Sequence, residues 1–455
     1  MPELQVIGGG LAGCEAAWQL AERGHSVKLV EMRPVRGTPA HQTDDLAELV
    51  CTNSFKSEDT SNAHGLLKAE MRDLGSVLLA AADDARVPAG TALAVDRVLF
   101  AQAVTARVAG HPRIQLVRDE MLALPDTPAV IASGPLTSDS LSASIHSLLG
   151  DGGLAFYDSI APIVAGDSIN FDIAFYQSRW GKGDGDDYVN CPMSREQYEA
   201  FLAALRESDV YPGHEWEKIP YFEGCLPIEV SAGRGDDTLR FGPMKPVGLR
   251  DPHTDNRPYA VVQLRREDFE GRMWNMVGFQ TRLRTGEQRK VFTMIPGLEN
   301  AEFLRTGSIH RNTYLNFPSA LNEYGAHASR PDLIFAGQLT GVEGYMESAA
   351  SGIVAGINLH RVVSGLDAAI PPSTTMMGGL MRYLREASPG NFQPMNSNFG
   401  LLDSMEGRIR DKDERKKRTV ARARENFAMW AADAGALAAD AGATNAISAA
   451  DNANA

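Results

Sequence analysis

The chain has 455 residues, a length that corresponds to about three average domains or to two larger ones. Apolar residues make up 44% and charged residues 22% of the sequence, which is typical of a folded globular protein and excludes a disordered or fibrous one. The net charge of -14 argues against a protein that binds nucleic acid through its overall charge, so an RNA partner would need local basic patches.

The sequence carries no sign of a membrane or secreted protein. No apolar run approaches the ~18 residues of a membrane span, and the N-terminal MPELQVIGGG lacks the segments of a signal peptide. The cysteines at positions 14, 51, 191 and 225 are widely spaced and form no CxxC pair, so we expect neither a disulfide framework nor a metal site. We therefore expect a cytoplasmic protein whose cysteines act as thiols.

The first thirty residues follow a strand, helix, strand pattern. Residues 4–7 form an apolar run, residues 11–23 carry apolar side chains at helical spacing, and residues 25–30 form a second apolar run. This order predicts a βαβ unit at the start of a parallel sheet.

A glycine-rich turn links the first predicted strand to the helix. Its sequence, Gly8-Gly9-Gly10-Leu11-Ala12-Gly13, is a GxGxxG motif. The first glycine permits the turn, the second lets a pyrophosphate approach the backbone, and the third lets the helix pack on the strand. Glu31 ends the second strand, where its carboxylate would accept hydrogen bonds from adenosine ribose hydroxyls. The motif in this context predicts a dinucleotide site.

Two later apolar runs end abruptly at glycine, residues 129–133 before Gly134 and residues 333–336 before Gly337. Both are typical of parallel strands that deliver a loop to a cofactor, and a helix over about 344–360 follows the second. Because the sheet is completed so late, a second domain must be inserted in the first. We predict an α/β fold, with a Rossmann-like FAD-binding domain of the glutathione-reductase type over 1–160 plus 315–430 and an inserted α+β domain over 161–314.

The predicted inserted domain mixes helix and strand signals. Ser194 and Gln197 form a capping-box pattern before a helix with apolar residues at 198, 201, 202 and 205. Strand-like runs cover 259–264 and 274–280. Beyond the inserted domain, a charged helix carries Val420, Ala423, Phe427 and Trp430 on one face. From residue 431 to 455 the Ala-rich tail has little to bury, and we expect it to be disordered.

A second glycine cluster indicates that the cofactor is FAD. The sequence from 336 to 345, with Gly337, Gln338 and Gly344, starts another helix. A flavin needs such a second loop across the sheet from its adenosine, and a helix N-terminus would stabilise negative charge on the reduced ring. The alternative is a plain turn without a ligand. No second complete GxGxxG occurs, so NADH or NADPH would bind without a Rossmann site of its own.

Several segments together resemble the TrmFO family of folate- and FAD-dependent tRNA (uracil-5-)-methyltransferases, from residue 2 to about 430. They are VIGGGLAGCEAAWQLAERGHSVKLVEMRP, LVCTNSFKS, AHGLLKAEMRDLGS, EGCLPIEVSAGRGDDTLRFGPMKPVGL, GSIHRNTYLNFP and AGQLTGVEGYMESAASG. The resemblance implies formation of 5-methyluridine at position 54 of the tRNA T-loop, with methylenetetrahydrofolate as carbon donor and NADH or NADPH as reductant of FAD. The related MnmG family shares the glycine loops but is longer and lacks the EGCLPIE segment.

This chemistry requires a reactive thiol, because uracil C5 is a poor nucleophile until a thiolate adds to C6. A base must then remove the C5 proton, and a hydride from reduced flavin completes the methyl group. The resemblance assigns Cys225, in the turn-forming FEGCLP, as the nucleophile and Cys51 as the general acid/base, although the two roles are open to exchange. Cys51 follows an apolar residue and precedes polar ones, which suggests a strand end facing the flavin. For Cys14 and Cys191 we expect small buried side chains.

Substrate contacts are assigned from side-chain chemistry. His310, Arg311 and Asn312 offer a stacking face and hydrogen bonds for the pterin or the uracil, although a structural role is the commoner one for a histidine in a strand. Two basic clusters suit tRNA phosphates: one contains Arg282 and Arg284 with positions 289 and 290, and the other spans 408–424. A solvated helix face is the alternative for the second cluster.

Two other classes of function remain open at this point. One is an NAD(P)H-dependent flavoprotein oxidoreductase that does not act on RNA, for which the glycine loops alone would suffice. The other is an FAD-stabilised RNA-binding protein without catalysis. The sequence does not decide the oligomeric state, the choice between NADH and NADPH, or the route of the carbon unit.

Overall fold

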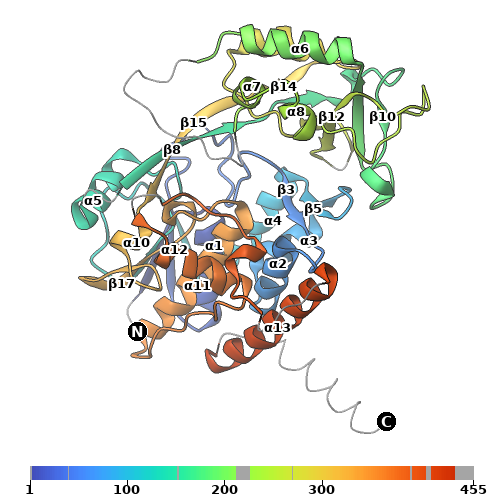
Figure 1. Cartoon of the computed structure of the whole chain (residues 1–455). Helices are drawn as coiled ribbons and strands as arrows, with labels where there is room; N and C mark the ends of the chain where they lie inside the picture. Colours follow the sequence, from blue (N-terminus) through green and yellow to red (C-terminus); the bar gives the residue numbers. More distant parts are fainter. Residues whose placement is uncertain are drawn as a thin grey trace.

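The computed structural model describes residues 3–38, 40–150, 153–211, 226–268, 270–389, 392–405 and 411–435, with the backbone alone over 153–160 and 308–313 and at residue 412. Figure 1 shows two bodies, one above the other, joined by a long two-stranded ribbon. Each body has its own apolar core: one contains the N-terminal strands together with α11, and the other contains Trp274, Tyr198 and Phe279.

The lower body is built on a six-stranded sheet with the order β16-β17-β7-β1-β2-β6. All neighbouring strands are parallel except β16 and β17. The strands are β1 (Leu4–Ile7), β2 (Val27–Glu31), β6 (Ile114–Arg118), β7 (Ala129–Ile131), β16 (Ala326–His327) and β17 (Arg330–Phe335). The predicted late completion of the N-terminal sheet is confirmed, because β17 pairs with β7 in parallel.

Two helices that are far apart in the sequence pack closely against each other on this sheet. They are α1 (Leu11–Glu22) and α11 (Tyr345–Val363). A Cβ atom placed on Gly352 of α11 would lie 2.2 Å from the carbonyl oxygen of Ala12 on α1. The glycine is therefore required for this close approach, which brings the starts of both helices to the same edge of the sheet.

The rest of the lower body surrounds a small sheet with the order β3-β5-β4. Its strands are β3 (Ser54–Ser57), β4 (Arg86–Val87) and β5 (Ala92–Val95). The other helices of the lower body are α2 (Ala63–Asp73), α3 (Val77–Asp84), α4 (Arg97–Ala109), α5 (Asp139–Leu149), α10 (Phe317–Ala320), α12 (Met376–Glu386) and α13 (Lys412–Asp433).

The upper body contains a second six-stranded sheet with the order β10-β11-β12-β13-β9-β14. The strands are β9 (Ile163–Ala165), β10 (Phe175–Tyr176), β11 (Tyr188–Met193), β12 (Ala260–Arg266), β13 (Met273–Met276) and β14 (Phe303–Arg305). Its helices are α6 (Arg195–Glu207), α7 (Ile228–Gly233), α8 (Thr238–Phe241) and α9 (Thr285–Phe292). The predicted capping box is confirmed at the start of α6, where Ser194 and Gln197 exchange hydrogen bonds.

The connecting ribbon consists of β8 (Gly153–Ile160) and β15 (Ser308–Leu315), which are antiparallel. Polar contacts also join the two bodies. The Asn53 side chain of the lower body donates to the carbonyl oxygen of Arg266 at 2.9 Å, and Arg265 donates from Nε to the Asn53 Oδ1 at 2.9 Å. The inserted body is thus linked to the lower body in two ways, by the ribbon and by hydrogen bonds to Asn53.

Several element ends differ from the predictions. β13 stops at Met276, short of residue 280, because Gly278 turns the chain with φ 77. The helix predicted from residue 344 begins at Tyr345, since Gly344 has φ 112. The C-terminal helix continues past residue 430 to Asp433, and Ala431 is fully buried. The tail prediction over 436–455 lies outside the described residues.

No described helix is long and apolar enough to cross a membrane.

The predicted apolar face of α13 is confirmed: Ala423 and Phe427 are fully buried, and Val420 and Trp430 pack against the same core. The helix thereby packs against the lower body by its apolar side, and Arg424 adds an ion pair with Asp73 of α2.

Candidate functional site

The GxGxxG turn lies at the carboxyl ends of β1 and β2. Gly8 has φ 105, and its N–H donates to the carbonyl oxygen of Val30 at 2.8 Å. A Cβ on Gly13 would lie 1.8 Å from the Gly8 carbonyl oxygen, so only glycine fits where α1 packs against the turn. At Gly10, by contrast, no described atom lies within 4 Å of a Cβ position. Open space therefore faces the N-terminus of α1, where a helix favours a phosphate group.

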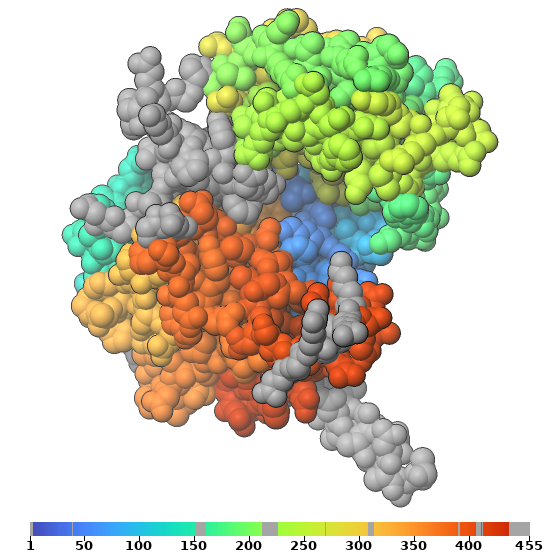
Figure 2. All heavy atoms as spheres, viewed as in Figure 1, coloured from blue at the N-terminus to red at the C-terminus, as the bar shows by residue number. Residues whose placement is uncertain are grey.

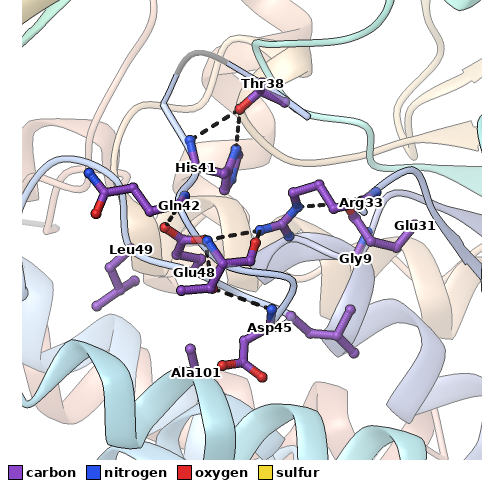
Figure 3. A network of polar contacts seen from close by, with 12 residues as sticks. Gly9, Glu31, Arg33, Thr38, His41, Gln42, Asp45, Glu48, Leu49 and Ala101 are labelled. Carbon is purple, nitrogen blue, oxygen red and sulfur yellow. Dashed lines mark hydrogen bonds and ion pairs between the residues drawn. The ribbon is translucent and has the colours of Figure 1, made fainter. Parts of the chain in front are cut away.

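Glu31 is held at the end of β2 by a buried network, drawn in Figure 3. Its Oε2 accepts from the Gly9 N–H at 2.7 Å, and its Oε1 accepts from Arg33 Nε at 2.7 Å. Burial raises the pKa of this carboxyl, but Arg33 and the Gly9 N–H lower it more, leaving it below its usual value. Glu31 is therefore an ionised acceptor.

The network continues from Glu31 towards the next loop. Arg33 Nη1 donates to Glu48 Oε2 at 3.1 Å, and Glu48 in turn accepts from the N–H groups of Gln42 and Thr43 at 2.8 and 3.0 Å. In Figure 3 the Arg33 side chain reaches from Glu31 to Glu48. The loop that leads to Cys51 is thus anchored to the dinucleotide turn.

A shallow pocket that is open to solvent adjoins this network. It is lined at its base by the carboxyl ends of β1 and β2, and at its sides by Asp119, Met121, Ser133, Thr137 and Leu141 among others. Apolar side chains, a carboxylate and hydroxyls match an adenine with its ribose. Together with the open space at Gly10, this pocket fits the adenosine and pyrophosphate part of a dinucleotide.

The second glycine cluster lies beside the first, because β17 delivers it to the same sheet edge. Gly337, Gly341 and Gly344 all have positive φ values, 79, 86 and 112. The Gly337 N–H donates to Ser351 Oγ at 2.7 Å, and Gln338 Nε2 donates to Glu343 Oε2 at 3.2 Å. α11 starts directly after the cluster, so a second helix N-terminus faces the edge at which the first lies.

Cys51 is fixed against the start of α11. The hydroxyl oxygen of Tyr345, the first residue of α11, accepts from the Cys51 N–H at 2.8 Å and from the Thr52 N–H at 3.3 Å. Tyr345 is partly buried, and burial followed by the charge of Cys51 raises the pKa of its phenol. The predicted strand-end position is wrong, because Cys51 lies in a loop that precedes β3. The loop nevertheless brings the thiol to the second glycine cluster.

Arginines from both bodies surround the Cys51 loop. Arg97 of α4 donates from Nη1 to the Leu49 carbonyl oxygen at 2.8 Å and forms an ion pair of 2.6 Å with the fully buried Glu267 of the upper body. Burial alone would lower the pKa of Arg97, but Glu267 raises it above its usual value. Arg265 donates to Thr52 Oγ1. The loop is therefore clamped between the two bodies.

Arg305, the last residue of β14, adds a positive charge beside the Cys51 loop. Its half-buried guanidinium interacts electrostatically with Cys51, Tyr345, Arg97 and Glu267, yet this side chain forms no hydrogen bond or ion pair with a described residue. Burial and the charge of Arg97 lower the pKa of Arg305. A partly desolvated cation is stabilised by a nearby anion, so the position suits an anionic group of a reactant.

The other predicted site residues are placed as follows. Cys14 and Cys191 are fully buried, as expected, and burial raises the pKa of both thiols. Cys225 lies outside the described residues. His310, Arg311 and Asn312 lie on β15 opposite Asp158, Tyr157 and Phe156 of β8, and their side chains are outside the described part of the chain.

The two basic clusters are on different bodies. Arg282 forms an ion pair of 3.4 Å with Glu229, and the guanidinium of Arg284 lies 5.5 Å from the centre of the Tyr211 ring. On α13, Arg418 pairs with Glu414 and Arg424 pairs with Asp73. Within the described part of the second cluster, Arg415, Lys416 and Lys417 form no ion pair.

Comparison with known proteins identifies the family. Residues 3–367 match the family model "Glucose inhibited division protein A". The chain is 55% identical over 428 residues to the "Methylenetetrahydrofolate--tRNA-(uracil-5-)-methyltransferase TrmFO" of Geobacter sulfurreducens, covering 94% of this chain and 98% of that one. The protein of the same name from Bacillus subtilis is 53% identical over 424 residues, covering 93% and 97%. The chain belongs to the TrmFO family.

A solved structure agrees with this TrmFO-family fold. The structure of Aquifex aeolicus GidA in the form II crystal superposes with a TM-score of 0.67 at 15% identity, covering 96% of this chain and 74% of that one. Likeness at this identity concerns the fold alone. With the observed sheets, it confirms the predicted class, a Rossmann-like FAD-binding fold with an inserted α+β part.

Sequence reasoning missed most residues around Cys51 in this TrmFO-family site. Arg97, Arg265, Glu267 and Arg305 carry no local signal, because they meet only when the inserted body folds onto the lower one. Tyr345 could have been predicted as a site residue, because it directly follows the last glycine of the second cluster. Arg33 follows Glu31 closely enough to have been recognised as its partner.

Proposed function

We propose that this chain is a methylenetetrahydrofolate-dependent tRNA (uracil-5-)-methyltransferase that uses FAD, reduced by NADH or NADPH, to form 5-methyluridine at position 54 of the T-loop. The observation that carries the proposal is the anchoring of Cys51 by Tyr345 at the second glycine cluster. Relatives that bear the activity in their names are more than half identical over nearly the whole chain, which supports it. We place the protein in the cytoplasm, where its tRNA is found.

The glycine loops would hold the cofactor. Backbone around Gly8, Gly9, Gly10, Leu11, Ala12 and Gly13 would bind the pyrophosphate, and the ionised Glu31 would bind the ribose. Gly337, Gln338 and Gly344 would bind the flavin end. When bound, FAD supplies the hydride that completes the methyl group. NADH or NADPH would bind only transiently.

The cysteines would divide the covalent work and the proton transfer. Cys225 would add as a thiolate to uracil C6, and Cys51 would take the C5 proton. The fixed backbone at Cys51 supports a positioned acid/base, because proton transfer needs the thiol at hydrogen-bonding distance from C5. His310, Arg311 and Asn312 would contact the pterin or the uracil. The inserted body, over residues 161–314, would contribute Arg282 and Arg284 to tRNA binding.

A tRNA that carries 5-fluorouridine at position 54 tests which of the two cysteines adds to uracil C6. Fluorine cannot leave C5 as a proton does, so the attacking thiol stays bound to C6. In the presence of methylenetetrahydrofolate, we expect a denaturation-resistant protein–RNA adduct with the wild type and with Cys51→Ala, and none with Cys225→Ala.

The control is Cys191→Ala, which removes a buried thiol in the core of the upper body and should form the adduct normally. An adduct that persists in Cys225→Ala but disappears in Cys51→Ala would exchange the two roles. A tRNA with cytidine at position 54 should form no adduct; one that reacts would contradict the assigned position.

A further inference from the structure

The sheet of the upper body has two faces with different surroundings. The face that packs against α6 contributes these residues to the core of the upper body: Val164, Val189, Leu264, Trp274 and Phe303. Because successive side chains of a strand point to opposite faces, the residues next to them in the chain point away from this core. The second face is therefore free to meet the lower body.

One row of paired residues crosses this second face. Arg265 of β12 is opposite Asn275 of β13, Asn275 is opposite Ile163 of β9, and Ile163 is opposite Arg305 of β14. Residues that are opposite each other on adjacent strands have their side chains on the same face, about 5 Å apart. Arg265 and Arg305 are therefore on one face, with two strands between them.

This row faces the loop that carries Cys51. Arg265 donates from Nε to Asn53 Oδ1 at 2.9 Å, and its Nη2 donates to the hydroxyl of Thr52, the residue after Cys51. Both acceptors belong to the lower body. The hydrogen bonds thus fix which way the row points, and they place one of its two ends directly at the Cys51 loop.

Arg305 belongs to the row because of a β-bulge. Phe303 and Arg305 are opposite two consecutive residues of β9, so Leu304 is the extra residue of β14, and it is 49% exposed. In a regular strand Arg305 would share the face of Phe303, inside the apolar core. The bulge instead turns the guanidinium towards the lower body, in agreement with its electrostatic interaction with Cys51 and Tyr345.

The charges around the loop favour an anion. Arg97, Arg265 and Arg305 contribute three guanidinium groups. The carboxylate of Glu267 is already held by Arg97 at 2.6 Å, and that of Glu48 is bound within the network of Figure 3. Arg305 has neither a hydrogen bond nor an ion pair with the residues that the structure describes. Its guanidinium is thus left for a ligand.

A ligand can reach the space between the two bodies from solvent. Figure 2 shows a hollow between the upper body, in green, and the lower body, in orange and red, with blue atoms of N-terminal segments on its floor. Arg305 itself is only half-buried. A flat base that enters between the bodies would therefore meet the face of the upper sheet on one side and the lower body on the other.

We propose that Arg305 is a catalytic residue that binds O4 of the target uracil as this oxygen becomes negatively charged. When the Cys225 sulfur bonds to C6, the C5–C6 π electrons form a C4–C5 double bond, and the C4–O4 π electrons move to O4. O4 thereby takes up the charge of the thiolate, and a fixed cation stabilises this enolate more than neutral uracil. Because C4 is bonded to C5, where Cys51 would act, a cation beside Cys51 suits O4. The inference rests on the proposed function.

The rate of adduct formation in a single turnover, with tRNA that carries 5-fluorouridine at position 54, tests the role of Arg305. Arg305→Gln should form the adduct about 100-fold more slowly than the wild type. Arg305→Lys should lose only about tenfold, because it keeps the charge without the planar fork. The Kd for tRNA and the half-saturating concentration of methylenetetrahydrofolate should stay within about twofold. Flavin absorbance and urea unfolding show whether each variant is folded, and Arg305→Lys decides if Arg305→Gln is not.

The charge control is Arg195→Gln, since Arg195 is exposed on α6, which packs on the other face of the sheet. It should form the adduct at the wild-type rate. A wild-type rate in Arg305→Gln would overturn the inference alone. A raised Kd for tRNA at an unchanged rate would assign Arg305 to a phosphate, and a raised half-saturating folate concentration would assign it to a folate carboxylate; either result overturns the inference. A wild type that forms no adduct would refute the proposed function and the inference with it.

A change at C4 of the substrate tests the contact from the other side. In tRNA that carries 5-fluoro-4-thiouridine at position 54, sulfur replaces O4 and is a weaker hydrogen-bond acceptor. The two single changes and their combination form a cycle that measures the coupling between Arg305 and this atom. The loss caused by Arg305→Gln should shrink from about 100-fold to less than about tenfold. An equal loss with both tRNAs would show that Arg305 acts elsewhere.

Discussion

Tyr345 is the residue on which the geometry of Cys51 depends most directly. Its hydroxyl oxygen is the acceptor for two successive N–H groups of the Cys51 loop. Because Tyr345 also begins α11, it couples the thiol to the helix that follows the second glycine cluster. Removing this single oxygen should therefore alter the position of the Cys51 thiol without disturbing α11.

Tyr345→Phe should lower kcat about tenfold while leaving bound FAD unchanged. The reason is that two N–H groups lose their acceptor, at a cost of about 1–3 kcal/mol each where they are buried, and the loop shifts. Steady-state methylation kinetics and the flavin absorbance measure the two effects. Tyr383→Phe is the control, since that hydroxyl donates to the Gln393 carbonyl oxygen at 2.8 Å in another part of the lower body. An unchanged kcat in Tyr345→Phe would show that the contact is not needed.

At the scale of elements, the sequence predicted what depends on local pattern. The βαβ unit, the capping box of α6 and the apolar face of α13 follow from spacing and from glycine or serine at helix starts. The surroundings of Cys51 could not be predicted, because Arg97 and Glu267 are paired across two bodies that fold around separate cores. Residues that meet only by domain docking leave no periodic signal in the chain.

Two glycines of the first motif should respond differently to alanine. Gly10→Ala should fold normally and lose most of its FAD affinity, because the new methyl group enters open space at the N-terminus of α1. Gly13→Ala should be destabilised by several kcal/mol, since its methyl would overlap the Gly8 carbonyl oxygen. Denaturant unfolding of the FAD-free protein and FAD titration separate the two effects. Equal loss of stability in both variants would contradict the assignment of the open space to the cofactor.

A buried carboxyl joins α2 to α12 and makes stability depend on pH. Glu70 accepts from the N–H groups of Met376 and Met377, both at 2.8 Å, and burial raises the pKa of its carboxyl to about 8 from an ordinary 4.5. The folded state thus holds this proton more tightly than the unfolded state. The protonated Glu70 carboxyl therefore contributes to the free energy of unfolding. This contribution is complete below pH 4.5 and is lost as the pH rises through about 8.

The free energy of unfolding of the wild type, minus that of Glu70→Gln, should therefore fall between pH 5 and pH 8. The subtraction removes the contribution of other titrating groups, including His25 and His360, which both variants share. Urea unfolding at three pH values in this range provides the measurement. A difference that is constant or rises with pH would contradict the account of Glu70.

At the scale of the whole molecule, the two bodies enclose the parts that the proposed reaction needs. The lower body supplies both glycine loops and Cys51, and the upper body supplies Arg265, Glu267 and Arg305 around the same loop. This arrangement predicts one composite site, in which a carbon unit, a reductant and an RNA base meet.

The most direct test of this account follows a labelled carbon. The purified FAD-loaded protein is incubated without oxygen with NADH or NADPH, methylenetetrahydrofolate labelled in its methylene group, and unmodified tRNA, and the nucleosides are then separated. The account predicts label in the C5 methyl group of the uridine at position 54, and none with Cys225→Ala. Oxidation of the nicotinamide nucleotide with no label in the tRNA would contradict it.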